Sequence, residues 1–360
     1  MDEAVDEAVE KAVDQAVDEA VDRAVDQAVD GAADEQAAAR ERIEGILLGG
    51  PRRYSRADVT RLSGVSAERT QEIWRALGFA VTDEDEIVFT DGDLLALAGG
   101  ERFIEAGLIT ADSETAMTRQ LGHHLSRLAE WQVMTIWSWL EGISELEPGD
   151  EEFARLVEIL LPELERLQTH VWRRHLAAYA GRTLTAPGER QEASLKAVGF
   201  TDMVAYTRMT RGLDDAQLDS VLGRFEALAG DVIADHGGRL VKTIGDEVLF
   251  TADTPDAAAE IALELTERAA ADEVVPRLRT GLAYGTVLSR YGDVYGEVVN
   301  IAARLTSVAR PGTVVASEEL AERLARGGAY ELRALRPVSV RGYSRLRSAV
   351  LRRAGRGGAV

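Results

Sequence analysis

The sequence predicts two domains of different classes, an all-α domain followed by an α+β domain. With 360 residues, the chain is longer than one typical domain, so two domains are the default expectation. All five tryptophans precede residue 180, in segments where apolar residues recur at helical spacing. After residue 192, short apolar segments alternate with helical ones, which predicts helices on one face of a largely antiparallel sheet. We therefore expect a helical domain over residues 36–180, a linker over 181–192 and an α+β domain over 193–345.

The two ends of the chain differ in composition from the rest. Residues 1–30 carry eleven Asp or Glu against Lys11 and Arg23, and they repeat Ala-Val-Asp-x with a period of four. Four residues overshoot one helical turn, so the Val stripe spirals around a helix, and the acidic side chains repel each other. We expect residues 1–35 to form an acidic, solvated, partly helical or disordered extension, with a weak coiled contact as the alternative. The Arg-rich tail over 346–360 is expected to be solvated.

Composition argues against several classes of protein. The net charge of −21 argues against a nucleic-acid-binding surface over most of the chain. The chain has no cysteine and therefore neither disulfides nor thiolate metal sites, which fits a reducing cytoplasm. No uninterrupted apolar stretch approaches membrane-spanning length, and the N-terminus is acidic rather than basic and then apolar. We expect a soluble, cytoplasmic protein without a membrane span.

Two short helices are expected within residues 54–79, on either side of Ser63-Gly64-Val65-Ser66, with Ser66 capping the second. This segment resembles the helix-turn-helix of small bacterial regulators. It has no broad basic face, and the acidic run 83–85 follows it closely. We therefore favour a helical packing unit over a DNA-binding element.

Residues 113–180 are expected to be mostly helical, with a break at Pro148-Gly149. The tryptophans favour a large aromatic core, with an apolar ligand pocket as the alternative. His170 and His175 lie shortly before the linker. Because histidine titrates near neutral pH, their protonation could reset how the two domains dock. The alternative for each histidine is an ordinary exposed position on a helix.

In the α+β domain, the segment Leu240–Phe250 is typical of a β-hairpin. Apolar residues flank a Gly-Asp turn, in which Gly245 supplies the permissive backbone. The other expected elements are strands near 193–200, 277–283, 313–316 and 337–342 and helices near 201–211, 214–236, 255–271 and 298–309.

Two carboxylates stand at the ends of expected strands. Asp202 follows the first strand and precedes a helix, and Asp246 lies in the hairpin turn. Carboxylates at the ends of neighbouring strands can hold two hard divalent cations such as Mg²⁺ or Mn²⁺, which in turn hold phosphate oxygens. The backbone N–H groups after Asp202 would help to hold the phosphates. The alternative is a pair of unrelated carboxylates that never meet.

Four more polar residues suit a nucleotide. Asn300 and Arg304 stand four residues apart, on one face of an expected helix. An Arg can stabilise charge that builds on phosphorus, and an Asn can orient a ribose. Lys242 in the hairpin and Asp293 in the turn before the helix could read an adenine edge as donor and acceptor. Taken singly, each is more often a solvated surface residue.

Three segments carry a resemblance to a known family. Residues 200–207 (Phe-Thr-Asp-Met-Val-Ala-Tyr-Thr), 242–246 (Lys-Thr-Ile-Gly-Asp) and 293–304 are similar to the catalytic domain of class III adenylate cyclases. The resemblance implies a ferredoxin-like fold, a homodimer with two active sites at the interface, ATP as substrate and two divalent cations. Ala205-Tyr206 stands where Gly-Phe is commoner, a departure that concerns the phosphate loop and not the metal ligands.

All six signature positions of that family are filled. The resemblance implies metal binding by Asp202 and Asp246, and adenine selection by Lys242 and Asp293. It also implies ribose positioning and transition-state stabilisation by Asn300 and Arg304. Guanylate cyclases of the family typically carry Glu and Cys as selectors, so ATP is expected rather than GTP. Arg341 is a further candidate for the triphosphate, with an exposed strand Arg as the equal alternative.

The helical domain resembles the N-terminal regulatory domain of actinobacterial adenylate cyclases that respond to pH, through the segments Trp74–Phe79 and Phe89–Asp93. This resemblance implies regulation by protons or, as in some members, by a fatty acid. We therefore expect a homodimeric adenylate cyclase that forms 3′,5′-cyclic AMP and pyrophosphate by two-metal-ion catalysis. The alternative is a catalytically silent nucleotide-binding signalling module. A diguanylate cyclase, whose Gly-Gly-Asp-Glu turn resembles Ile244–Glu247, leaves Lys242 and the Asn300/Arg304 pair unexplained.

Overall fold

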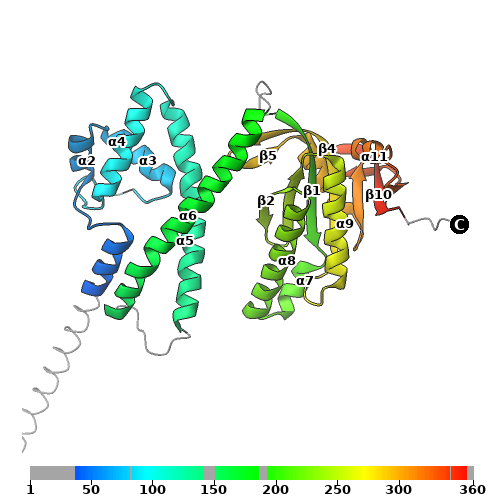
Figure 1. The fold of residues 1–360 in the computed structure, drawn as a ribbon, viewed down its shortest axis with the longest axis horizontal. Coiled ribbons are helices and arrows are strands. Elements are labelled where there is room, and N and C mark those ends of the chain that lie inside the picture. Colours follow the sequence, from blue (N-terminus) through cyan, green and yellow to red (C-terminus); the bar gives the residue numbers. More distant parts are fainter. Residues whose placement is uncertain (1–36, 82, 142–150, 186–192, 341, 355–360) are drawn as a thin grey trace, which may run out of the picture. The chain divides into compact units, whose positions relative to one another are not determined.

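The computed structural model describes residues 37–81, 83–141, 151–185, 193–340 and 342–354. The chain divides into two compact units, Met1–Ala180 and Gly181–Val360, which we call the helical unit and the α+β unit (Figure 1). No helix within the described ranges is long and apolar enough to cross a membrane. The predicted acidic extension, the break at Pro148-Gly149, Arg341, most of the linker and the end of the Arg-rich tail lie outside the described residues.

Short capped helices and two long helices build the helical unit. Ser55, Ser66 and Thr90 each accept a hydrogen bond from the backbone N–H three residues further on, which starts a helix after each of them. The predicted cap at Ser66 is thus confirmed. The helices cover residues 37–47, α2 Arg56–Ser63, α3 Ala67–Leu77, α4 Asp91–Glu105, α5 Ala111–Glu141 and α6 Glu151–Thr185.

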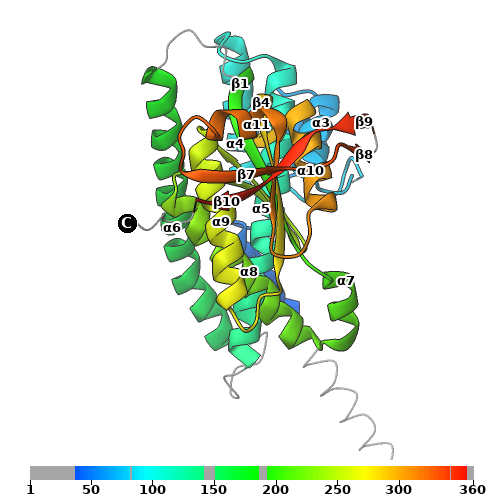
Figure 2. The ribbon, with the colours of Figure 1, turned by 90° about the vertical axis from the view of Figure 1, so that its right-hand side faces the viewer.

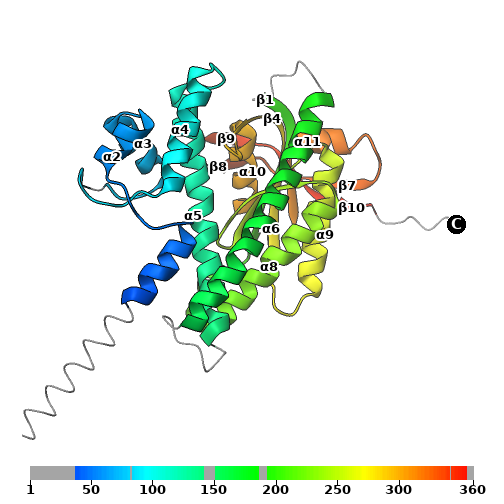
Figure 3. The ribbon, with the colours of Figure 1, turned by 60° about the vertical axis from the view of Figure 1, so that its left-hand side comes forward.

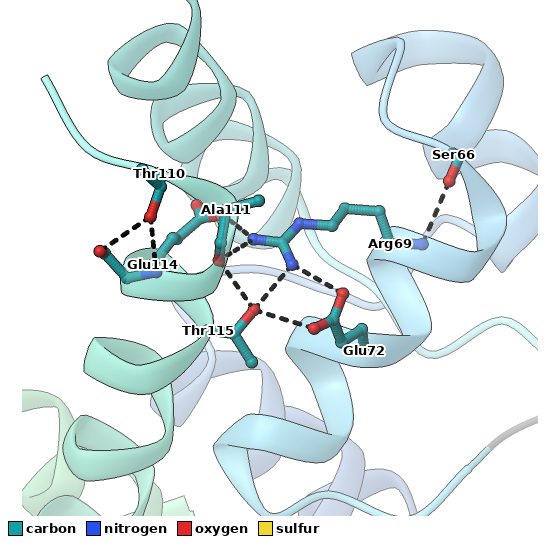
Figure 4. Close-up of polar contacts among 8 residues, drawn as sticks. Ser66, Arg69, Glu72, Thr110, Ala111, Glu114 and Thr115 are labelled. Carbon is teal, nitrogen blue, oxygen red and sulfur yellow. Dashed lines mark hydrogen bonds and ion pairs between the residues drawn. The ribbon is translucent and has the colours of Figure 1, made fainter. Parts of the chain in front are cut away.

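Arg69 of α3 fastens this helix to the start of α5 (Figure 4). Its guanidinium donates to the Thr115 hydroxyl at 2.7 Å and to the Ala111 carbonyl at 3.1 Å. It also pairs with Glu72 at 2.7 Å and with Glu114. The second helix of the helix-turn-helix-like segment therefore packs against α5, as a helical packing unit does.

The large aromatic core predicted for the helical unit is wrong for the single chain. Trp74 does pack beside Phe79 and Phe89 in a small core. The other tryptophans have exposed fractions of 64% (Trp131), 39% (Trp137), 56% (Trp139) and 60% (Trp172). Both long helices also expose further large apolar side chains, so their apolar residues do not all face the core of the single chain. Helical spacing therefore predicted the helices correctly, but it did not predict which faces are buried.

One twisted sheet forms the centre of the α+β unit, with strand order β2-β3-β1-β4-β6-β10-β7 and β5 paired to β4. The β4–β6 pair is parallel and the other described pairs of this sheet are antiparallel. The strands of this sheet are β1 Ala193–Met203, β2 Arg239–Ile244, β3 Glu247–Ala252, β4 Leu278–Arg290, β5 Asp293–Tyr295, β6 Val314–Ser317, β7 Tyr330–Ala334 and β10 Ser348–Arg353. A second, two-stranded sheet contains β8 Val338–Val340 and β9 Tyr343–Leu346.

Helices cover both faces of the sheet, so the prediction of helices on one face is wrong. The cores differ: Ala197 and Met203 of β1 pack toward α8 and α9, whereas Val198 and Phe200 pack toward α10. Figures 2 and 3 show α10 on the opposite side of the strands from α8 and α9. The helices are α7 Tyr206–Met209, α8 Asp215–Asp235, α9 Pro255–Ala271, α10 Glu297–Val308 and α11 Glu318–Leu324. Strand β1 is apolar on both faces, which a sheet covered on one side does not need.

Most predicted elements of this unit are confirmed, and the β2–β3 hairpin, α8, α9 and α10 match their predicted ranges closely. The helix predicted from residue 201 is wrong at its start, because β1 continues to Met203 and the short helix α7 begins only at Tyr206. Asp202 therefore lies within a strand, paired with both neighbouring strands. Asp293, predicted in a turn, is the first residue of β5.

Candidate functional site

Asp246 forms the tip of the β2–β3 hairpin and lies beside Asp202. Gly245 takes a φ of +60°, the left-handed conformation that a tight turn needs. The Asp246 carbonyl accepts a hydrogen bond from the Met203 amide at 3.0 Å, which docks the turn on the end of β1. Burial raises the pKa of Asp202, Arg279 counteracts this, and a side-chain hydrogen bond with Asp246 and its charge raise the pKa further. The structure thus brings the two predicted carboxylates together.

Two charged residues that were not identified from the sequence surround this pair. Arg279 faces Asp202 in the β1–β4 ladder, and its Nε donates to Asp202 Oδ2 at 2.6 Å. Burial, and then repulsion by Asp202 and Asp246, raise the pKa of Glu247 to about 7. The available signals were an Arg within an apolar strand and a Glu beside the turn Asp. Their convergence depends on strand register, which spacing along the chain does not reveal.

The donor set fits a divalent cation. Asp202 and Asp246 offer the oxygen ligands that Mg²⁺ and Mn²⁺ prefer. Burial first, and the neighbouring carboxylates after it, raise the pKa of Asp202 and of Glu247, although Arg279 acts in the opposite direction. Within the described ranges, no three or more His, Asp or Glu side chains form a ready metal cage. Two carboxylates that leave coordination positions for substrate phosphates and water are typical of Mg²⁺ in nucleotide enzymes.

The predicted selector pair is also formed. Lys242 Nζ lies 2.5 Å from Asp293 Oδ2, with 40% of the Lys242 side chain and 25% of the Asp293 side chain exposed. The other carboxylate oxygen of Asp293 accepts a hydrogen bond from the Val294 amide at 2.8 Å. A cation and a carboxylate are thus held side by side with part of each still accessible, which suits the recognition of a donor–acceptor edge.

Asn300 and Arg304 lie one turn apart on α10, and the strands below hold this helix closely. A Cβ at Gly281 of β4 would lie 2.3 Å from the Ala302 carbonyl oxygen, so only glycine permits this approach. The buried Thr306 hydroxyl donates to the Phe200 carbonyl of β1 at 3.1 Å. The helix that carries Asn300 and Arg304 is therefore seated directly on the strand that carries Asp202.

The predicted site residues form three groups within one chain. Asp202 meets Asp246, and Lys242 meets Asp293, whereas no described hydrogen bond or ion pair joins Asn300 or Arg304 to these pairs across the residues that the structure describes. Arg341 lies outside the described residues. His170 and His175 are both exposed on α6.

The helical unit contains an apolar cavity of about 840 Å³ between the helix 37–47, α5 and α6. This volume falls within the range of about 300–1,000 Å³ that small-molecule sites span. Its lining is mainly apolar and includes Leu47, Val133, Trp137, Phe153, Leu160 and Leu164. The charged residues of the lining are Arg40, Glu41 and Glu44.

Comparison with known proteins links these features to a family. Residues 189–352 match the adenylate and guanylate cyclase catalytic domain. An adenylate cyclase of Streptomyces coelicolor is 44% identical over 290 residues, which cover 79% of this chain and 75% of that protein. One from Streptomyces griseus is 42% identical, covering 80% of this chain and 72% of that protein. A pH-sensitive adenylate cyclase of Mycobacterium tuberculosis is 33% identical, covering 75% of this chain and 70% of that protein.

A match of 290 residues is longer than the α+β unit, so the similarity extends into the helical unit. The match of the catalytic domain over residues 189–352 includes the site residues described above, and the longer match adds part of the helices that precede them. The chain belongs to the class III nucleotide cyclases, the family of the adenylate and guanylate cyclase catalytic domain, with actinobacterial adenylate cyclases among its relatives.

Proposed function

We propose that two copies of this chain form an adenylate cyclase, which converts ATP into 3′,5′-cyclic AMP and pyrophosphate. The observation that carries this proposal is the approach of Asp202 and Asp246 at the end of β1, beside Arg279. The relatives named adenylate cyclases, at 44% and 42% identity over most of the chain, support the same reaction. The Lys242–Asp293 pair supports ATP over GTP.

Each residue has a role in this reaction. Divalent cations held by Asp202 and Asp246, Mg²⁺ or Mn²⁺, would activate the ribose 3′-hydroxyl and neutralise phosphate charge. Arg279 fixes the orientation of Asp202 through its hydrogen bond. Asn300 positions the ribose so that its 3′-oxygen attacks the α-phosphorus in line. Arg304 stabilises the charge that develops on that phosphorus as pyrophosphate leaves.

The base and the triphosphate are bound by other residues. Lys242 donates to the N1 acceptor of adenine, and Asp293 accepts from the 6-amino group. A base that lacks the 6-amino donor or the N1 acceptor leaves Asp293 or Lys242 without a hydrogen-bond partner, and this lowers the affinity. Arg341 is proposed to contact the triphosphate.

A second copy completes each site. Within one chain, the carboxylate pair and the Asn300/Arg304 helix make no described contact with each other, so we propose that each site takes the carboxylates from one protomer and the other residues from its partner. Pairing through the α+β units would then give two sites per dimer. These sites are related by the twofold axis.

The proposal is tested with Asp202→Ala and Asp246→Ala. Each variant should abolish cyclic AMP formation in Mg²⁺ or Mn²⁺ while the dimer persists, and a chelator should do the same to the native protein. Asp253→Asn is the matched control, because Asp253 is an exposed carboxylate that pairs with Lys196 away from the hairpin turn. Full activity in either alanine variant would refute the assigned ligands.

Mixing the variants tests the shared site. Dimers formed from Asp202→Ala and Asn300→Ala protomers contain one site without either substitution, so mixing should restore part of the activity. No recovery would count against a site built from two chains. Product analysis with ATP and GTP separates this function from the silent nucleotide-binding module, which forms no product, and from a diguanylate cyclase.

We also propose that the helical unit regulates the reaction. The apolar cavity of about 840 Å³ suits an acyl chain, and Arg40 is the cation in its lining that would pair with a carboxylate head, beside Glu41 and Glu44. The exposed His170 and His175 on α6 are proposed to sense protons. A fatty acid and a proton are thus both regulators that this unit could bind.

A further inference from the structure

A β-bulge in β2 puts two cations on the same face of the sheet. Arg239 pairs with Thr251 of β3, whereas Lys242 pairs with Leu249, and the register shifts by one residue between Leu240 and Lys242. In a regular strand, residues three apart point to opposite faces. The extra residue of the bulge brings Arg239 and Lys242 to the same face, because their partners Thr251 and Leu249 share one.

Both cations reach the same short hairpin. Arg239 donates a hydrogen bond from its guanidinium to the Gly292 carbonyl, and Lys242 pairs with the next residue, Asp293. β2 is an edge strand of the sheet, so these two side chains connect it to the β4–β5 hairpin. Arg239 thus holds the backbone immediately before Asp293.

The turn of this hairpin needs such support. Tyr291 and Gly292 join β4 to β5 with φ values of +54° and +81°, and the ladder places Arg290 opposite Asp293. Positive φ at two successive residues is typical of a tight hairpin turn, but for a bulky residue such as Tyr291 this conformation is strained. The Arg239 hydrogen bond to the second turn residue stabilises this conformation and the direction in which the following strand leaves.

We propose that Arg239 is a positioning residue that holds Asp293 beside Lys242 and thereby sets the preference for adenine over guanine. Because Lys242 and Asp293 select a base only if the chain is an adenylate cyclase, this role rests on the proposed function. Arg239 itself contacts the turn and needs no contact with the nucleotide.

The hydrogen-bonding groups of the two bases explain why the positions of Lys242 and Asp293 determine the preference for adenine over guanine. Adenine presents an amino donor at position 6 and an acceptor at N1, whereas guanine presents a carbonyl acceptor at position 6 and a donor at N1. A Lys and an Asp can satisfy either pattern if they exchange places along the edge of the base. Only fixed positions of both groups make guanine leave a polar group unpaired, which is the basis of strong discrimination. A loosened Asp293 would therefore accept guanine better.

The experiment compares ATP and GTP kinetics of the full chain, with GTP also tested as a competitor of ATP. Arg239→Ala should lower kcat/KM for ATP by about three- to tenfold, mainly through KM, because one charge-assisted hydrogen bond is lost. The ratio of kcat/KM for ATP to that for GTP, or of their binding constants, should fall by a similar factor. Arg239→Lys should recover part of this ratio, since it keeps a cation near the carbonyl.

Arg224→Ala is the matched control, because Arg224 on α8 pairs with Asp272 at 2.9 Å on the other face of the sheet. It should keep the native ratio. An Arg239→Ala protein that loses ATP and GTP activity equally, or that keeps the native ratio, overturns the proposal. If that variant does not fold, Arg239→Gln is measured by the same ratio. A native protein that forms no cyclic AMP refutes the proposed function instead, so the two failures are distinct.

Discussion

Arg69 joins two helices through a single guanidinium with little exposure. Its side chain is 15% exposed and that of its partner Glu114 is 17% exposed. Without the Arg69 cation, the largely buried Glu114 carboxylate would have neither a counter-charge nor full hydration. An unsatisfied buried group of this kind lowers the free energy of unfolding by about 1–3 kcal/mol. The docking of α3 on α5 therefore depends in part on the ion pair of Arg69 with Glu114.

This network predicts an acid-dependent loss of stability. Side-chain hydrogen bonds from Arg69 and then from Thr115 lower the pKa of Glu72 below its ordinary value of 4.5. A carboxyl whose pKa is lowered by folding stabilises the folded state at neutral pH. This contribution is lost as the pH falls from the ordinary pKa toward the lower pKa of the folded state.

We expect Glu72→Gln to be less stable than the native protein near neutral pH, with the difference shrinking below about pH 4.5. Urea unfolding followed by circular dichroism, at several pH values, measures this difference. The control is Glu105→Gln, on the exposed end of α4, which should track the native protein at every pH. A constant difference between Glu72→Gln and the native protein would contradict the role of this ion pair.

The site residues divide into those that local sequence identified and those that only register brings into place. Asp202, Asp246 and Lys242 stand in short motifs whose residue types suit metal and base binding. Arg279 could not be predicted, because its contact with Asp202 depends on the β1–β4 ladder between segments far apart in the chain. Arg239 lies on the same face of the sheet as Lys242 only because of a bulge, which the residue alternation of β2 did not predict.

Helix α10 rests on the backbone of β4. Gly281 and Gly285 both lie under it, but with different clearances. A Cβ at Gly281 would meet the Ala302 carbonyl oxygen and the Thr306 amide at 2.3 Å, whereas a Cβ at Gly285 would lie 3.5 Å from Val298. A Cβ at position 281 therefore requires α10 to move, whereas a Cβ at position 285 makes an ordinary van der Waals contact.

Gly281→Ala should therefore displace α10 and with it Asn300 and Arg304. We expect a loss of about 1–3 kcal/mol in the free energy of unfolding, as for other overpacked cores, and a fall in kcat. Gly285→Ala is the matched control on the same strand and face, and should change neither quantity strongly. Thermal unfolding and cyclic AMP assays of both variants provide the test. Equal behaviour of the two would show that the helix is not held by close contact.

Some element boundaries were predictable and others were not, for physical reasons. The start of α9 is marked locally, since Thr254 caps it and Pro255 occupies its first turn. The end of β1 was predicted too early because Thr201 and Asp202 are polar. Both are satisfied by a distant strand: the Thr201 hydroxyl bonds that of Thr280 at 3.0 Å, and Asp202 bonds Arg279. Polar residues at the end of an apolar segment predict the end of a strand. The strand continues here because side chains of β4 satisfy the hydrogen bonds of both residues.

The division into two units was visible in the sequence, but what covers their surfaces was not. Apolar periodicity in residues 113–180 predicted helices, and α5 and α6 exist. It carried no information on whether a face meets the same chain, a second chain or a ligand. The sequence therefore did not predict that Trp131 and Trp172 are exposed.

The regulatory proposal predicts the pH profile of the full chain. If His170 and His175 sense protons, acidification should relieve inhibition by the helical unit, and replacing both by Gln should flatten the dependence of cyclic AMP formation on pH. His123→Gln with His124→Gln is the control pair on α5, where these two rings lie 5.3 Å apart. An unchanged profile after replacement of His170 and His175 would discard their role. Repeating the profiles with a long-chain fatty acid tests the cavity, and no effect at any pH would exclude that ligand.

Because every tryptophan precedes residue 180, indole emission originates entirely in the helical unit, and the α+β unit contributes tyrosine emission alone. Four of the five indoles are accessible to water-borne quenchers such as iodide or acrylamide. A nucleotide that binds to the α+β unit and shifts this emission, or shields it from quenching, therefore alters the surroundings of indoles in the other unit. The native chain thus carries its own optical reporter of communication between its two parts.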